Sequence, residues 1–251
     1  MKVIFSPHND DAFLSLAGLM LKWRKNESVK VIDLFTRSAY TIFTGRQIKN
    51  PNDPKEGKLI EMITYLRKLE ETAAAKTIGV ELSFLDYDDA PLRGHDNYSF
   101  ISKVLWRIYN RPRKPIINEK GEDELAKNIR GIISDHADED CYFPLGVGGH
   151  VDHMMVARAA ANHYSENGSK PVTFYEDQPY TAYETEEDVD VIAKTVESLG
   201  ISLRPKTIPI NWQAKSELLA VYGSQIKPRH VDRLGAYCAN LGDCERIWST
   251  T

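Results

Sequence analysis

The amino-acid sequence lacks the features that mark several large classes of protein. No apolar run approaches the roughly 20 residues that a membrane-spanning helix needs. The formal net charge is −4, so there is no excess of basic residues to bind nucleic acid or an anionic membrane. We therefore expect a soluble protein with no nucleic-acid partner and no transmembrane segment.

Cysteine and glycine-rich motifs are also scarce. The three cysteines, Cys141, Cys238 and Cys244, are odd in number and lack the spacing of metal ligands. They suit a reducing compartment, so we expect a cytoplasmic protein. No Gly-x-Gly-x-x-Gly follows a strand pattern, and the glycine-rich stretch 146–149 lacks the lysine of a P-loop. A dinucleotide-binding function is therefore disfavoured.

The chain does contain an alternation of strand and helix patterns, which is typical of parallel α/β units. Short apolar runs predict strands at 2–5, 29–35, 82–85, 141–145 and 172–175. Helical spacing of apolar residues predicts helices at 12–25, 59–78, 100–109, 122–134, 153–164, 188–199 and 213–221. A length of 251 residues can bury a sizeable core, and we expect a single domain over 1–251.

Two stretches show no clear periodicity. Residues 37–58 follow a strand, and a loop of this length is usually functional or disordered, so it is a candidate lid or substrate loop. The residues after Ser224 also read as irregular. A plain solvated connection is the alternative for both stretches.

Two polar clusters far apart in sequence carry the candidate chemistry. One is His8-Asn9-Asp10-Asp11 and the other is His150-Val151-Asp152-His153. Each follows a predicted strand and precedes a predicted helix. Because sites in α/β proteins form at the carboxyl ends of the strands, the two clusters are expected to meet over one cleft.

The donor types and spacing predict a metal-dependent hydrolase. Catalytic zinc sites typically use three protein ligands and leave one position for water. We assign His8, Asp11 and His153 as metal ligands, Asp10 as general base and His150 as acid or oxyanion partner. Zn²⁺ is expected, although Fe²⁺ or Co²⁺ could fill a mixed histidine–carboxylate site.

Each of these residues also has an ordinary structural interpretation. A lone aspartate before an apolar helix is more often an N-cap, which applies to Asp10, Asp11 and Asp152. On this basis Asp152 receives no functional role. The occurrence of two clusters at strand-to-helix junctions favours the functional interpretation.

The sequence resembles the PIG-L/LmbE family of metal-dependent N-deacetylases. The first cluster is similar to the family's Pro-His-Pro-Asp-Asp motif, and the second contains its His-x-x-His motif. Further similarities are an Arg-x-x-Glu segment from Arg67, an acidic loop at 86–89, and Lys215 followed by Tyr-x-Ser-Gln at 222–225. The resemblance implies a Rossmann-like α/β fold, with a mostly parallel sheet flanked by helices on both faces. It also implies the same ligand, base and oxyanion roles as assigned above.

Two positions depart from the family pattern. Asn9 replaces the common proline, and Ala12 stands where many members have glutamate. Neither change removes a proposed donor. The first loosens a rigid turn, and the second suggests a distinct subgroup.

Five further residues are candidates for substrate binding: Arg67, Asp89, Arg93, Glu176 and Asp177. A guanidinium can bind hydroxyl or phosphate oxygens, and carboxylates suit sugar hydroxyls or a free amine. The alternatives are a helix-surface ion pair for Arg67 and solvated loop charges for Asp89 and Arg93.

The expected function is removal of an N-acetyl group from an amino sugar or glycoconjugate through a zinc-bound water. The partner would be a small N-acetylated sugar, and homo-oligomerisation is left open. Two alternatives remain: an amidase acting on another N-acyl conjugate, and a non-catalytic carbohydrate-binding protein of the same fold.

Overall fold

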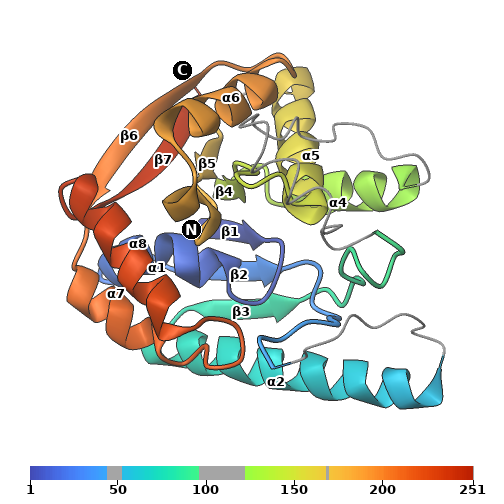
Figure 1. The fold of residues 1–251 in the computed structure, drawn as a ribbon. Helices are drawn as coiled ribbons and strands as arrows, with labels where there is room; N and C mark the ends of the chain where they lie inside the picture. Colours follow the sequence, from blue (N-terminus) through green and yellow to red (C-terminus); the bar gives the residue numbers. More distant parts are fainter. Residues whose placement is uncertain (44–52, 96–121, 168–169, 251) are drawn as a thin grey trace.

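The computed structural model describes residues 1–43, 53–95, 122–167 and 170–250. Its centre is a seven-stranded sheet in the order β3-β2-β1-β4-β5-β7-β6 (Figure 1). The strands are β1 (Lys2–Ser6), β2 (Val29–Asp33), β3 (Glu81–Phe84), β4 (Asp140–Pro144), β5 (Thr173–Tyr175), β6 (Leu203–Pro209) and β7 (Cys244–Thr250). Neighbours among β1 to β5 pair in parallel, whereas β7 is antiparallel to both β5 and β6. The predicted mostly parallel α/β sheet is confirmed.

Helices cover both faces of this sheet (Figure 1). They are α1 (Asp11–Trp23), α2 (Pro54–Ile78), α4 (Asp123–Asp135), α5 (Val151–Asn167), α6 (Glu186–Glu197), α7 (Trp212–Leu219) and α8 (Pro228–Asn240), with a 3₁₀ turn at Tyr180–Tyr183. Side chains of β1 alternate between the faces, as strand geometry requires. Val3 and Phe5 join the core under α4, α5 and α6, while Ile4 joins the core under α1, α2, α7 and α8.

The region after Ser224 was predicted to be irregular, and this prediction is wrong. It contains helix α8 and strand β7, and β7 connects β5 to the edge strand β6. Strand β6 was missed as well, because its two prolines, Pro205 and Pro209, argue against a central strand. Proline is tolerated in this strand because it lies at the sheet edge.

Other boundaries differ by less. Helix α2 begins at Pro54, five residues before the predicted start, because the Asp53 side chain accepts a hydrogen bond from the Lys55 amide and caps the helix. The last positions of the predicted loop 37–58 are therefore helical. Residues 44–52 of this loop and the predicted helix 100–109 lie outside the described residues.

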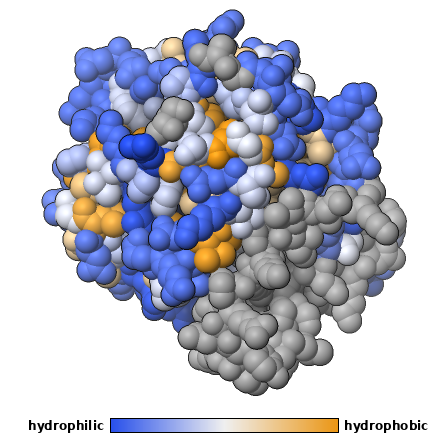
Figure 2. Space-filling model, turned by 90° about the horizontal axis from the view of Figure 1, so that it is seen from above, coloured by the Kyte–Doolittle hydropathy of each residue, from blue (hydrophilic) through white to orange (hydrophobic). Residues whose placement is uncertain are grey.

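The surface seen from above is mainly hydrophilic, and its apolar side chains form small separate patches (Figure 2). In the described part of the chain, no helix combines the length and apolar character that crossing a bilayer requires.

Candidate active site

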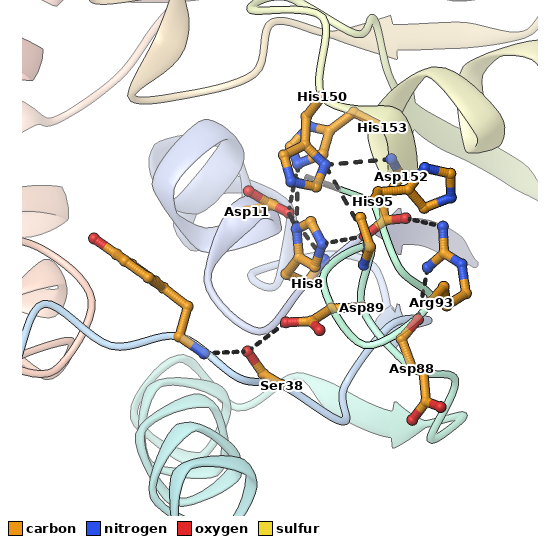
Figure 3. Close-up of polar contacts among 12 residues, drawn as sticks. His8, Asp11, Ser38, Asp88, Asp89, Arg93, His95, His150, Asp152 and His153 are labelled. Atoms are coloured by element: carbon orange, nitrogen blue, oxygen red, sulfur yellow. Dashed lines mark hydrogen bonds and ion pairs between the residues drawn. The ribbon is translucent and has the colours of Figure 1, made fainter. Parts of the chain in front are cut away.

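The two polar clusters meet at the carboxyl edge of the sheet. His8 and Asp11 follow β1, and His150 and His153 lie at the start of α5, after β4. Because β1 and β4 are hydrogen-bonded neighbours, the loops that leave them lie together. The side chains of His8, Asp11, His150 and His153 converge in Figure 3.

Three donor atoms converge on one point. The Asp11 Oδ2 atom lies 3.0 Å from His8 Nδ1 and 3.1 Å from His153 Nε2, and these two nitrogens are 3.3 Å apart. Donors bound at about 2.0–2.1 Å to a tetrahedral ion lie roughly 3.3 Å from one another. The spacing and chemistry of this set therefore fit a divalent metal ion.

His150 adds a third imidazole to the same place. One nitrogen each of His8, His150 and His153 lies within 4.8 Å of the other two. The Nδ1 atom of His150 accepts a hydrogen bond from the Asp152 amide at 3.2 Å, which assigns the proton of the neutral ring to Nε2. Burial and the neighbouring His8 lower the pKa of His150 to about 3, so this ring is a neutral hydrogen-bond donor.

Buried carboxylates are hydrogen-bonded to the ring nitrogens of His8 and His153 that point away from the three converging donor atoms. His8 Nε2 lies 2.8 Å from Asp152 Oδ2, and His153 Nδ1 lies 2.6 Å from Asp177 Oδ1. Carboxylates of this kind fix the tautomer and orientation of metal-binding histidines. The earlier interpretation of Asp152 as a simple N-cap is therefore wrong, and its place between His150 and His153 was the available signal.

The same carboxylates set the charge of the site. Burial alone would lower the pKa of His8, but hydrogen bonds to Asp11 and Asp152 raise it to about 9. Burial likewise opposes ionisation of Asp11, yet the facing His153 and His8 hold its pKa well below the usual range. Asp11 is therefore an anionic donor between two imidazoles.

Asp10 differs from its neighbour Asp11 in its backbone conformation, its charged partner and the direction of its pKa shift. It makes no side-chain cap to α1, and its φ of 125° is strained for a non-glycine residue. Its nearest cation is Arg67, whose Nη2 lies 3.5 Å from Asp10 Oδ1. Burial, reinforced by the charge of Asp11, raises the pKa of Asp10 to about 7. The N-cap alternative for Asp10 has no support, and its carboxyl group remains available for proton transfer.

Arg67 and Asp89 lie beside the cluster and share one partner, Ser38. The Ser38 hydroxyl donates to Asp89 Oδ2 at 2.7 Å, and Arg67 Nη1 donates to the Ser38 hydroxyl at 2.7 Å. The second Asp89 oxygen is buried without a hydrogen-bond partner. Ser38, which the sequence did not single out, thus links two predicted substrate-binding residues to the start of the 37–58 loop.

Arg93 was expected to bind substrate, but protein groups occupy its guanidinium. It donates to Asp152 Oδ1 at 2.7 Å and to the Asp88 carbonyl at 2.6 Å (Figure 3). It also donates to Glu122 Oε1 at 2.6 Å. Arg93 therefore positions Asp152, and through it His8.

Glu176 and Asp177 also have protein partners in place of the expected substrate. Glu176 is buried against Arg246, Tyr237 and Trp248, whose Nε1 donates to it at 2.8 Å. These contacts join β5 to β7 and α8. Asp177 is fully buried against His153, so we correct its role from substrate binding to positioning.

The fold and the histidine–carboxylate pairs define an α/β protein with a buried candidate metal centre. A family model described as PIG-L: GlcNAc-PI de-N-acetylase matches residues 3–164, which include both polar clusters. The chain belongs to the PIG-L family.

Individual relatives support the same placement. The chain is 28% identical over 225 residues to 2'-N-acetylparomamine deacetylase from Streptomyces fradiae, covering 89% of this chain and 72% of the relative. The zinc-inhibited form of teicoplanin deacetylase Orf2 has a similar fold, with a TM-score of 0.66 at 19% identity over 100% of this chain and 97% of the other. A hydratase, GalB from Pseudomonas putida KT2440, is similar at a TM-score of 0.54, with 16% identity over 99% of this chain and 96% of that one. Since one fold includes both a deacetylase and a hydratase, the reaction must be argued from the site.

Proposed function

We propose that the protein is a metal-dependent hydrolase that removes the N-acetyl group of an amino sugar. The observation that carries this proposal is the convergence of two imidazoles and one carboxylate beside Asp10, a second acidic residue whose backbone is strained. The PIG-L family and the relative named for an N-acetylated aminoglycoside support the same bond and substrate class.

His8, Asp11 and His153 would hold the ion, with zinc as the first candidate and Fe²⁺ or Co²⁺ as alternatives. A divalent ion held there would polarise a carbonyl group and would lower the pKa of water to about 7. Asp152 and Asp177 accept hydrogen bonds from His8 Nε2–H and His153 Nδ1–H, which fixes the tautomers in which the other ring nitrogens, His8 Nδ1 and His153 Nε2, have a lone pair for the ion.

Proton transfer is the task we assign to Asp10. Its carboxylate takes a proton from the attacking water, and Arg67 offsets the charge of the ionised form. The Nε2–H group of His150 donates to the oxygen that becomes negative when the amide carbonyl is attacked. The departing amine then takes the proton that Asp10 received from the water, which returns Asp10 to its carboxylate form.

For the substrate we retain Arg67 and Asp89 as binding residues. The unpartnered buried oxygen of Asp89 needs a donor, and a sugar hydroxyl supplies one. Ser38 places both residues at the beginning of the 37–58 loop, which we propose as the substrate loop.

We further propose that residues 1–251 form one catalytic domain in the cytoplasm. The first and the last described strands belong to the same sheet, which supports a single domain. All three cysteines are free and buried, and free cysteines suit a reducing compartment.

The experiment is an assay for amine and acetate release from N-acetylated amino sugars, both free and linked to larger groups. We expect the purified protein to contain about one equivalent of divalent metal, to release amine, to lose activity with a chelator and to recover it with Zn²⁺. Stoichiometric metal without release from any sugar, but with release from another N-acyl conjugate, would favour the amidase. Metal and sugar binding without turnover would favour the carbohydrate-binding alternative.

A further inference from the structure

One face of α2 carries a stripe of large apolar side chains that remain exposed. Met62, Tyr65, Leu66 and Leu69, named here the α2 stripe, are 69%, 66%, 40% and 48% exposed. They make up half of the eight large apolar residues that are exposed in the described chain. Single exposed apolar residues are ordinary, whereas a contiguous group marks an interaction surface. The spacing i, i+3, i+4, i+7 places all four on one helix face.

The α2 stripe faces away from the candidate active site. The opposite face of α2 is buried and carries Arg67 and Glu71, together with the apolar residues Ile60 and Ile63. Helix α2 runs along the lower margin of the molecule in Figure 1. A partner could therefore cover the stripe without contacting the Arg67 side of the helix.

We propose that the α2 stripe is the interface through which two copies of this chain pair. The spacing of the four residues is symmetric about the midpoint between Tyr65 and Leu66. A twofold axis through that point maps the stripe onto itself, so that Met62 of one copy faces Leu69 of the other in an antiparallel helix pair. A closed symmetric dimer requires this kind of self-complementary surface.

The available area fits the apolar centre of a dimer interface. At the observed exposures the four side chains form an apolar patch of a few hundred Å² per copy, the size of patch that is often functional on a monomer. Each partner of a standard interface contributes roughly 800 Å², of which a little more than half is apolar. The exposed residues Lys58 and Glu61 beside the stripe contribute to a polar rim.

The charges around the stripe favour a protein partner over a membrane. Helices that lie on anionic membranes have a polar face rich in lysine and arginine. Here the exposed neighbours Lys58 and Glu61 have opposite charges, and Lys68 is paired with Asp86. The net charge of the whole chain, −4, points the same way.

The test is the oligomeric state of the full chain, measured by sedimentation equilibrium between about 1 and 100 µM. We expect a dimer for the natural sequence. Leu66→Glu places two carboxylates near the twofold axis and is expected to raise the dissociation constant at least about 100-fold. Tyr183→Glu is the matched control, because Tyr183 is 42% exposed and lies outside the stripe. It should leave the dimer intact. Circular dichroism melting curves check that both variants fold.

A second pair of variants tests the pairing of Met62 with Leu69. The double variant Met62→Glu/Leu69→Lys brings opposite charges together across the axis, whereas Met62→Glu/Leu69→Glu brings like charges together. We expect the first to dimerise at least about tenfold more tightly than the second. A monomeric natural protein at every concentration, a dimer insensitive to Leu66→Glu, or flotation of the protein with anionic vesicles would each overturn the proposal.

Discussion

Two histidines of the candidate metal centre, His8 and His153, are each held by a buried carboxylate and its partners, named here the support of that histidine. The two supports are built from different kinds of hydrogen-bond donor. On the β1 side, His8 is hydrogen-bonded to Asp152 Oδ2, which also accepts the Ala90 amide at 3.0 Å, while Asp152 Oδ1 accepts a hydrogen bond from the Arg93 side chain. Arg93 is itself held by Glu122. This support therefore includes a long side chain whose position depends on yet another residue.

On the β4 side, His153 is bonded to Asp177, and the second Asp177 oxygen accepts two main-chain amides, those of Gly146 at 2.7 Å and Val147 at 2.8 Å. Main-chain donors in a tight turn are already ordered, whereas ordering a long side chain costs up to about 2 kcal/mol of conformational entropy. The support on the β4 side is therefore rigid, whereas the support on the β1 side depends in part on Arg93 and is adjustable. We expect the rigid support to tolerate substitution less well.

The largest expected effect concerns Asp10, which belongs to neither support. Asp10→Asn removes the proposed base without removing a metal ligand, so kcat should fall by about 10²- to 10⁴-fold. Metal affinity, measured by chelator competition, should stay within a few-fold of normal. Near-normal turnover would remove Asp10 from the mechanism.

The second prediction compares the metal affinities of variants in the two supports. Asp177→Asn and Asp152→Asn should each weaken metal binding by about 10- to 100-fold, the range found for such partners. Asp177→Asn should have the larger effect. The NH₂ group of the new asparagine would face either two fixed main-chain N–H groups or the N–H of the His153 ring, and in both places a donor meets a donor. Chelator competition on both variants measures the order. Equal losses, or a larger loss for Asp152→Asn, would contradict the distinction between rigid and adjustable supports.

The smallest expected change in metal affinity comes from Arg93, the residue behind Asp152 in the support on the β1 side. Arg93→Met leaves Asp152 held by His8 and by the Ala90 amide, so metal affinity should fall by about threefold, less than for a residue that contacts a ligand directly. Arg37→Met is the control, since Arg37 forms an exposed ion pair with Asp88 and should not change metal affinity. A loss as large as that of Asp152→Asn would mean that Arg93 and Asp152 act as one unit.

Several features of the site could be predicted from local sequence. His8, Asp10, Asp11, His150 and His153 stand at strand-to-helix junctions, and parallel strands deliver their carboxyl ends to one edge. Local spacing could not identify the partners of Arg93, Glu176 and Asp177. In a sequence, a charged side chain that positions another residue looks the same as one that binds a sugar. The pairing depends on contacts such as that between Asp152 and Ala90, which are 62 residues apart.

The amino-acid sequence alone specifies which chemical groups stand at the ends of the strands, because residue type and periodicity are local properties. It also determined the strands β1 and β4 that bring these groups together, through their short buried apolar runs. The folded arrangement of the strands and helices sets which carboxylate is hydrogen-bonded to which imidazole. It likewise decided that the proline-containing segment β6 and the tail strand β7 extend the sheet. Both depend on hydrogen bonds between distant parts of the chain, whose geometry exists only once the strands and helices have packed.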